Sequence, residues 1–466
     1  MLVTLIVSCA LFMELLDGTV IATALPQIAR SFGENAADIG VGISAYLVTL
    51  AVFIPISGWT ADRIGSRTVF AAAIVVFTLA SALCGMSGTL PEFTLARILQ
   101  GIGGAMMVPV GRLVVFRSTE KRDLIRANAL LTTPGLVALV VGPALGGLIT
   151  TYASWRWIFF LNLPLGIAGL ALVLLFMEDG RVELAPRFDP AGFVLSGVGL
   201  GLLMFGLDLV GRGDPNALRS AVLIVSGIAV AALSVRHARR VKHPLLDFSL
   251  LRIPTFASSV WGGTCVRLVI GTTPFLWGLL FQVGFAMSAL GAGLLLLTCA
   301  IGDVGSRPFT TRAVRRFGFR AVLTRDALLL AAGILGCAFL SPRTPLVATV
   351  ALLLFIGVVR SLAFTAINTL AYADVPSERM SAATSLASTL QQLSFGISVA
   401  FAAIVLHVAA RIHHEQGGVY GIADFRIAFC AVAVIGLAAA YNFAKLAPDA
   451  GHVVSGHHGR GGRYAK

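Results

Sequence analysis

Charged residues are scarce in this chain of 466 residues. Asp, Glu, Lys and Arg together make up 12% of it, whereas hydrophobic residues make up 57% and the mean hydropathy is +0.90. A water-soluble globule needs a surface rich in charged and polar side chains, so this composition excludes one. The sequence instead indicates a polytopic membrane protein.

Lysine is rarer still, with four residues, at positions 121, 242, 445 and 466, and none of them follows a glycine. A phosphate-binding P-loop needs a Gly-Lys pair, so we expect no ATP-driven transport and no enzyme. There is no H-E-x-x-H motif, the six cysteines lie singly in apolar segments, and His413 and His414 are expected in a solvated loop. These patterns predict neither a disulfide framework nor a metal site.

Long apolar runs are what the chain has in abundance. Stretches of about 20 apolar residues, the length that crosses a ~30 Å hydrocarbon core, predict fourteen transmembrane helices. Their expected ranges are 2–28, 39–61, 67–87, 91–116, 124–151, 156–177, 189–210, 217–235, 254–284, 287–306, 320–341, 345–372, 381–410 and 425–446. The expected fold class is therefore an all-α polytopic membrane protein.

Basic residues are distributed unevenly between the two sides of the predicted membrane. Of the 35 Lys and Arg residues, 24 fall in loops on one side, 7 in loops on the other and 4 within spans. Basic loops remain in the cytoplasm, so we expect both termini to be cytoplasmic. This pattern also accounts for the net charge of +13 without nucleic acid.

Two basic turns recur at equivalent places, DRIGSRTVF after the second predicted helix and SRPFTTRAVRRFGFRAV after the tenth. The repeat predicts an N-terminal six-helix bundle over 1–180, two inserted helices with flanking loops over 181–252 and a C-terminal six-helix bundle over 253–447. Residues 448–466 are expected to form a disordered cytoplasmic tail. Two bundles around a central cavity are typical of rocking transporters. Unrelated basic cytoplasmic turns are the alternative.

Asp17 lies inside the apolar run that opens the chain, where an acid needs both a partner and a use. At about 1.5 Å per residue, Asp17 lies roughly 22 Å above the cytoplasmic end of its helix and Arg97 roughly 9 Å below the outer surface, so the two can meet. Arg97 favours the ionised carboxylate and burial the neutral one, and a proton-exchange site requires this competition. Glu14, one turn below Asp17, could share or relay the proton. A static ion pair bracing two helices is the alternative.

Four motifs occur in order along the chain, LLDGTVIATALP (15–26), GWTADRIGSR (58–67), RILQGIGG (97–104) and VVGPALGG (140–147). The last three resemble signatures of the major facilitator superfamily, and the first is similar to that of its fourteen-helix drug:proton antiporters, the EmrB/QacA-like subfamily. WRWIFFLNLPLG (155–166) and RSLAFTAINTLAYADVP (360–376) strengthen the resemblance, which covers essentially the whole chain. It implies a major facilitator fold of two six-helix bundles plus two additional helices.

The gating motif of this family corresponds here to Gly58, Asp62, Arg63, Gly65 and Arg67. We expect Asp62 to accept a hydrogen bond at a helix N-terminus of the opposite half, near Ser381, while Arg63 and Arg67 reach acids or carbonyl groups. Such contacts would latch the outward-facing state. Ser66 stands where the family often has a basic residue, so this turn carries less charge. An ordinary basic turn with a capping Asp is the alternative.

The antiporter motif that the resemblance implies corresponds to Gly142, Pro143, Gly146 and Gly147. Proline removes a helix hydrogen bond and glycine removes side-chain bulk, so this helix can kink and approach a neighbour closely. The resemblance makes the motif a hinge that seals the cytoplasmic leak. Close packing without gating is the alternative.

Candidate residues of a substrate cavity lie in the C-terminal half, and they are Trp261, Arg267, Trp277, Asp303, Arg360, Asn368 and Gln391. Arg267 and Arg360 could bind an anionic part of a substrate or pair with a buried carboxylate such as Asp303. The amides could supply hydrogen bonds to a substrate. Arg112, 15 residues beyond Arg97, is expected to snorkel to the cytoplasmic interface.

These observations predict an antiporter that exports amphipathic organic compounds or drugs in exchange for protons, without a cofactor. The alternatives are an exporter or flippase of a physiological amphiphile, such as a lysolipid, siderophore or amino-acid derivative, and a non-transporting membrane sensor. The expected partners are the substrate, protons and membrane lipids. Members of the subfamily in double-membraned bacteria often pair with a periplasmic adaptor, and we expect this chain to be a monomer.

Overall fold

The computed structural model describes residues 2–34, 36–178, 187–212, 216–412 and 420–456. Within these ranges the regular structure is helical throughout. The helices are α1 (Leu2–Phe32), α2 (Ala36–Phe53), α3 (Ser57–Ile64), α4 (Ser66–Met86), α5 (Leu90–Ser118), α6 (Leu124–Tyr152), α7 (Arg156–Phe160), α8 (Asn162–Phe176), α9 (Pro190–Gly211), α10 (Ala217–Ala238), α11 (Pro254–Leu279), α12 (Ala289–Cys337), α13 (Leu346–Ala373), α14 (Met380–Ile412), α15 (Ile422–Ala444) and α16 (His452–Ser455).

Short helical turns connect or extend these elements. Four are 3-10 turns, η1 (Ile54–Ile56), η2 (Lys121–Asp123), η3 (Phe248–Arg252) and η5 (Ser377–Arg379), and η4 (Leu280–Gly284) is a π-helical turn that continues α11.

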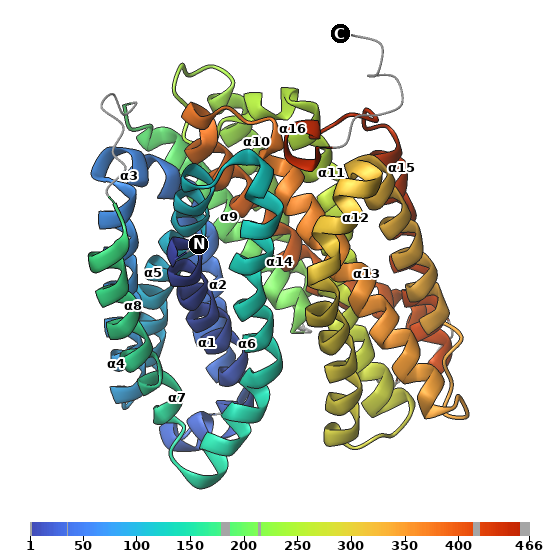
Figure 1. Cartoon of the computed structure of the whole chain (residues 1–466). Coiled ribbons are helices and arrows are strands. Elements are labelled where there is room, and N and C mark those ends of the chain that lie inside the picture. Colours follow the sequence, from blue (N-terminus) through green and yellow to red (C-terminus); the bar gives the residue numbers. More distant parts are fainter. Residues whose placement is uncertain (1, 35, 179–186, 213–215, 413–419, 457–466) are drawn as a thin grey trace.

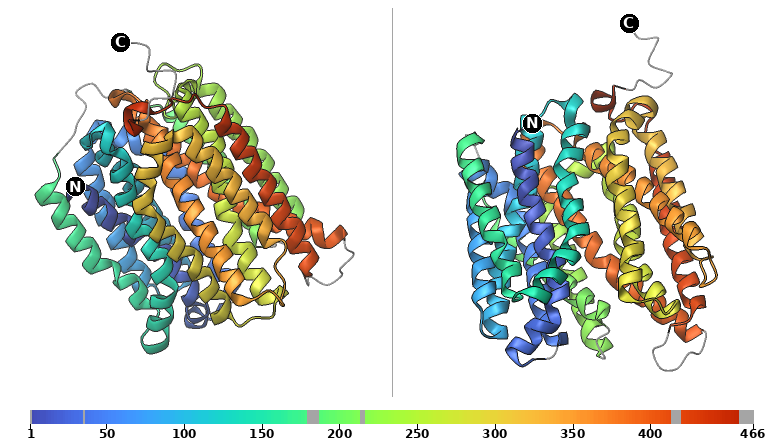
Figure 2. Two further views of the ribbon diagram at one scale, coloured as in Figure 1. Left: turned by 45° about the vertical axis from the view of Figure 1, so that its right-hand side comes forward. Right: turned by 60° about the horizontal axis from the view of Figure 1, so that its bottom comes forward.

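The helices form two groups, α1 to α8 and α11 to α15 (Figures 1 and 2). In Figure 1 the two groups approach each other at the end that carries the C-terminus and diverge towards the opposite end. Large aliphatic and aromatic side chains are buried within each group, while many others remain exposed on the outside. An apolar exterior of this kind suits contact with lipid hydrocarbon rather than water.

Proline residues explain two breaks in the expected helices. The second predicted helix divides into α2, η1 and α3, because Pro55 has no N–H to bond the carbonyl group of the preceding turn. The sixth divides at Leu161 into α7 and α8, three residues before Pro164. The second break places Asn162 at the start of a new helix.

The tenth and eleventh predicted helices are joined in the structure. α12 runs from Ala289 to Cys337, but Gly318 inside it has φ 76° and ψ 163°, so two helices meet at this residue. A positive φ of this size suits glycine, which has no Cβ. The predicted loop at 307–319 is thus mostly helical, and the basic turn is confined to the neighbourhood of Gly318.

Eleven helices among the described residues are long and apolar enough to cross a membrane. This number counts neither α6 nor the two parts of α12. The structure therefore supports a multi-pass membrane protein, and the count of fourteen spans stays a prediction.

The inserted pair α9 and α10 lies against both groups through α9. Leu200 and Met204 pack with Ala51 of α2, and Leu207 packs in a second cluster with Ala400 of α14. α10 lies on the outer side of α9 and is largely exposed. α9 is therefore part of the contact between the two halves, whereas α10 is peripheral.

Part of the predicted disordered tail is ordered. Residues 452–455 form α16, with Val454 1% exposed, and this turn packs on α12 and η2. This turn is therefore ordered, contrary to the expectation from the sequence, because the apolar side chain of Val454 occupies a buried site. Residues 457–466 lie outside the described ranges.

Candidate functional site

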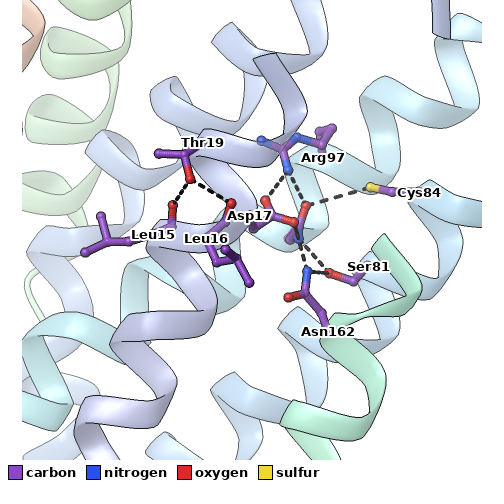
Figure 3. Close-up of polar contacts among 9 residues, drawn as sticks. Leu15, Leu16, Asp17, Thr19, Ser81, Cys84, Arg97 and Asn162 are labelled. Carbon is purple, nitrogen blue, oxygen red and sulfur yellow. Dashed lines mark hydrogen bonds and ion pairs between the residues drawn. The ribbon is translucent and has the colours of Figure 1, made fainter. Parts of the chain in front are cut away.

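Asp17 on α1 is buried beside a guanidinium group (Figure 3). Arg97 Nη1 of α5 lies 2.6 Å from Asp17 Oδ2, and the two residues are 0% and 2% exposed. Burial of either charge alone costs several kcal/mol, so each needs the other. The contact predicted from helix depth is present, and its role in proton exchange stays a prediction.

Two neutral amides complete the surroundings of this carboxylate. Gln100 Nε2 and Asn162 Nδ2 each donate to Asp17 Oδ1 at 2.9 Å, and they also donate to Ser81 Oγ, at 2.7 and 3.1 Å. Gln100 Oε1 accepts from Arg97 Nη1 at 2.6 Å. These five residues form what we call the Asp17 network, which presents N–H donors to both oxygens of one carboxylate.

The Asp17 network draws on four helices of the N-terminal half, α1, α4, α5 and α8. Gln100 follows Arg97 by one turn of α5, which puts both side chains on one face. Tyr46 of α2 adds a fifth helix, because the Arg97 guanidinium lies 4.4 Å from its ring centroid. A change in the charge of Asp17 therefore acts on most helices of this half.

Glu14 lies one turn from Asp17 but does not join the Asp17 network. Its Oε2 is buried and accepts no hydrogen bond from the described residues. The charges that act on it most strongly are those of Arg112 and Asp17. Glu14 thus lies between the Asp17 network and the interface of the two halves, and the predicted proton relay stays a prediction.

The gating motif contacts the start of α14 in the opposite half. Ser381 Oγ donates to Asp62 Oδ2, and Gly58 N–H donates to Ser385 Oγ at 2.8 Å. Arg117 Nη2 lies 2.9 Å from Asp62 Oδ1. A Cβ on Gly58 would lie 2.6 Å from the Ser381 carbonyl oxygen, so glycine permits this close approach. The expected contact near Ser381 is present, with the hydroxyl group as the donor.

The rest of the gating motif shapes the turn between α3 and α4. Gly65 has φ 108°, a value that favours glycine. Arg67 Nη2 donates to the Leu174 carbonyl oxygen at 2.5 Å, as expected for a residue that reaches a carbonyl group. Arg63 is exposed and forms no salt bridge with any described residue.

Further polar contacts join the two halves near the same end. Asn128 Nδ2 donates to the Thr365 carbonyl oxygen at 3.2 Å, and Lys121 Nζ donates to the Ala373 carbonyl oxygen at 3.3 Å. Arg307 Nη1 of α12 donates to a backbone carbonyl of α6 at 2.9 Å. The halves are thus held together where the gating motif lies.

The antiporter motif lies where α6 packs on α1. A Cβ on Gly142 would lie 2.0 Å from Thr19 Oγ1, so glycine is needed for this contact, whereas a Cβ on Gly147 would meet nothing within 4 Å. Gly146 is buried, and α6 stays helical through the motif and Pro143. Close packing at Gly142 is therefore observed, and the hinge stays a prediction.

In the C-terminal half, Arg360 pairs with a carboxylate. Its Nε lies 3.2 Å from Asp303 Oδ1, and its Nη2 forms an ion pair with Asp303 Oδ2. Of the two roles considered for this arginine, the structure shows the pairing with Asp303. A substrate would have to compete with a buried carboxylate for this guanidinium.

Arg267 and Arg112 contact amides instead. Arg267 Nη2 donates to Asn368 Oδ1 at 3.1 Å, and Arg112 Nη1 donates to Gln391 Oε1 across the two halves at 3.2 Å. The expectation that the Arg112 side chain snorkels to the cytoplasmic interface is wrong. Arg112 is 4% exposed, and its side chain faces the opposite half. The position of Arg112 along its helix gave its height in the membrane but not the direction of its side chain.

The two tryptophans proposed for the cavity do not lie together. Trp277 is 1% exposed, whereas Trp261 is 60% exposed. Trp261 precedes Arg267 by six residues, which places it about 120° away around α11. Trp261 therefore does not share a site with Arg267, and this part of the expected cavity is corrected.

The described residues hold no group of three or more His, Cys, Asp or Glu that could bind a metal ion. His413 and His414 lie outside the described ranges. Sequence reasoning missed Gln100, Asn162 and Ser81, although the first two stand inside the quoted motifs RILQGIGG and WRWIFFLNLPLG. The signal in the sequence that could have identified these two residues was a side-chain amide within each motif.

Comparisons with known proteins agree with these observations. A family model described as Major Facilitator Superfamily matches residues 7–399. A protein of Serratia proteamaculans (strain 568) named "Putative multidrug resistance protein MdtD" is 38% identical over 455 residues, which cover 95% of this chain and 93% of that protein. The protein of the same name from Escherichia coli O9:H4 (strain HS) is 37% identical over 448 residues, with 95% and 94% covered.

Two solved structures share the fold. The human organic anion transporter MFSD10 has a TM-score of 0.64 at 15% identity, covering 95% of this chain and 99% of its own. The proton:xylose symporter XylE has a TM-score of 0.60 at 15% identity, with 94% of each chain covered. The resemblance inferred from the motifs is confirmed: the chain belongs to the Major Facilitator Superfamily of membrane transporters, and it is not an enzyme.

Proposed function

We propose that this chain is a proton-coupled antiporter that exports amphipathic organic compounds, including drugs, by alternating access. Asp17 is the proton carrier and Arg97 its partner. The observation that carries the proposal is a single carboxylate, 2% exposed, held by one guanidinium and two amides between helices of the N-terminal half. Drug export is supported by the names of the relatives, which are about 37% identical to this chain.

The proton step follows from the chemistry of the Asp17 network. Ionised Asp17 accepts three hydrogen bonds, from Arg97, Gln100 and Asn162. Protonation removes the charge that holds Arg97, so the guanidinium loses its partner and the contacts between α1 and α5 weaken. Loss of the proton restores them. A change of packing inside one half is thereby linked to the arrival and departure of one proton.

The gating contacts supply the conformational step. Asp62, Gly58 and their partners on α14 close the end at which the two halves approach each other (Figure 1). Basic loops lie at this end, so it is the cytoplasmic end by the positive-inside rule. The conformation is therefore outward-facing, with the cytoplasmic gate closed. We propose that the protein is a monomer of the bacterial inner membrane with both termini in the cytoplasm.

Transport in proteoliposomes tests this proposal. In proteoliposomes with an acidic lumen, native protein whose cytoplasmic side faces outwards should take up a drug-like dye. Asp17→Asn should abolish this gradient-driven uptake. The variant should retain exchange of labelled for unlabelled dye without a gradient, because that exchange needs no net proton movement. Asp374→Asn, at an exposed carboxylate, is the matched control.

Two outcomes would contradict the proposal. Gradient-driven uptake that persists in Asp17→Asn would remove this residue from proton coupling. Absence of any gradient-driven flux in the native protein would favour the membrane sensor, which needs no titrating acid.

A further inference from the structure

Two arginines from opposite halves lie buried near each other at the interface. Arg112 belongs to α5 and Arg267 to α11, and each is 4% exposed. Their charges are close enough to act on one another, and Tyr372 of α13 lies near both guanidinium groups. Neither arginine forms a salt bridge with any residue that the structure describes.

Among the described residues, only neutral groups accept hydrogen bonds from these two arginines. Arg112 donates to Gln391 Oε1 and Arg267 donates to Asn368 Oδ1, while the Nε of each arginine has no hydrogen-bond partner within the described residues. The buried Tyr372 hydroxyl donates no hydrogen bond to any of the described residues. A buried charge needs more than an amide oxygen, so this cluster has an excess of N–H and O–H donors.

The other two arginines within predicted spans differ in this respect. Arg97 pairs with Asp17, and Arg360 pairs with Asp303. Glu14 lies close enough to Arg112 for their charges to interact, but it forms no salt bridge with any described residue and offsets at most one of the two charges. The region around Arg112 and Arg267 therefore keeps a net positive charge in either protonation state of Glu14.

We propose that Arg112 and Arg267 bind the oxyanion group of an organic anion, a carboxylate in the first instance, as the polar end of the transported substrate. This inference rests on the proposed function and names the substrate class of the same transporter. The planar guanidinium matches carboxylate and phosphate geometry, and charge-assisted bonds of this kind are roughly twice as strong as neutral ones. Tyr372 and Asn368 supply additional donors.

The position of the cluster fits alternating access. Because Arg112 and Arg267 come from different halves, a bound anion draws the halves together and its departure leaves two like charges facing each other. Repulsion between them then favours separation of the halves. Substrate release and gate movement are linked through this pair.

Binding to protein in nanodiscs of neutral phosphatidylcholine tests the inference without a proton gradient. The probes are 1-naphthoate, 1-naphthamide and 1-naphthyltrimethylammonium, which share one aromatic body and differ in charge. Native protein should bind the carboxylate at least about tenfold more tightly than the amide or the cation. Arg267→Gln and Arg112→Gln should each weaken carboxylate binding by about tenfold or more and leave amide binding unchanged. Arg343→Gln, at an exposed loop arginine, is the control.

A second measurement separates binding from a structural role. Removal of an uncompensated buried charge relieves a cost, so the ligand-free Arg267→Gln protein should melt no lower than the native protein. Arg267→Lys, which keeps the charge without the planar fork, should bind the carboxylate with intermediate affinity. Asp17→Asn should still bind the carboxylate more tightly than the amide, so failure of the proton mechanism is distinguishable from failure of this site.

The inference is overturned if 1-naphthoate does not bind more tightly than the amide and the cation, including the case in which none of them binds. It is also overturned if both glutamine variants bind 1-naphthoate like the native protein. A folded Arg267→Gln protein with a lowered melting temperature and unchanged affinity would assign Arg267 to structure.

Discussion

Asn162 donates a hydrogen bond to Asp17 across 2.9 Å, although 145 residues separate them. The contact exists because α7 ends at Phe160 and α8 starts at Asn162, so the amide stands at the first position of a helix. Asn162 therefore links the packing of α8 to the carboxylate that we assign to proton exchange.

Asn162→Ala should destabilise the protein by about 1–3 kcal/mol, because Asp17 Oδ1 then loses one of its two amide donors in a buried site. Unfolding by SDS in mixed micelles measures the difference in free energy. Ser81→Ala removes a bond to both amides but none to Asp17, so it should cost less. Equal losses in the two variants would show that Asp17 gains no special stabilisation from Asn162.

Gly142→Ala should lower the thermal stability, since the new Cβ would lie 2.0 Å from Thr19 Oγ1 and force α6 away from α1. Overpacking of this kind costs about 1–3 kcal/mol. Gly147→Ala is the matched control in the same motif, because a Cβ there meets nothing within 4 Å. Combining Gly142→Ala with Thr19→Ala should recover part of the loss. A tolerated Gly142→Ala would contradict the close packing.

Ser381→Ala should shift the protein away from the conformation with the closed gate. The variant loses the donor to Asp62 Oδ2, and a hydrogen bond to a charged group contributes about 1.5–3 kcal/mol, so the closed fraction should fall by roughly tenfold relative to the open one. Spin labels at the exposed positions Thr68 and Asp374, after replacement of the exposed thiols Cys9 and Cys430, report the distance between the halves. An unchanged distance distribution would show that this contact does not hold the gate.

Asp189 should give the protein a pH-dependent contribution to stability. Burial raises its pKa, but hydrogen bonds from the Gly192 N–H and from His237, together with the charge of His237, outweigh burial and hold the pKa below the ordinary 3.8. A depressed pKa stabilises the folded state at pH values above 3.8, and this contribution is lost as the pH falls through the lowered value. Asp189→Asn should therefore melt lower than native at pH 7, with the difference shrinking below pH 3.8.

The control for that experiment is Asp374→Asn, at an exposed carboxylate. It should melt like the native protein at both pH values. A difference between native and Asp189→Asn that stayed constant down to pH 3 would show that Asp189 acts through its shape rather than its charge.

Charge and depth were enough to predict one contact of the site. Asp17 and Arg97 are costly inside a membrane, so they stand out in an apolar sequence and their heights can be calculated from the helical rise. Asn162, Gln100 and Ser81 carry no charge and gave no comparable signal. The position of Asn162 also depends on the break at Leu161, which a count of apolar residues does not detect.

Height alone misled the interpretation of Arg112 and Trp261. The sequence gives how far each residue lies along its helix, but the direction of its side chain depends on which neighbours the helix has. Arg112 is buried facing Gln391 of the opposite half, and Trp261 is exposed on another side of α11 from Arg267. The arrangement of the two halves determined both outcomes.

Proton release on substrate binding tests the central claim most directly. Purified protein in a lightly buffered solution, with a pH-sensitive dye, should release protons when the transported compound is added, because substrate binding displaces the proton from Asp17. Asp17→Asn should bind the compound without releasing protons, while Asp374→Asn should behave like the native protein. Equal proton release from the native protein and Asp17→Asn would contradict the assignment of Asp17 as the proton carrier.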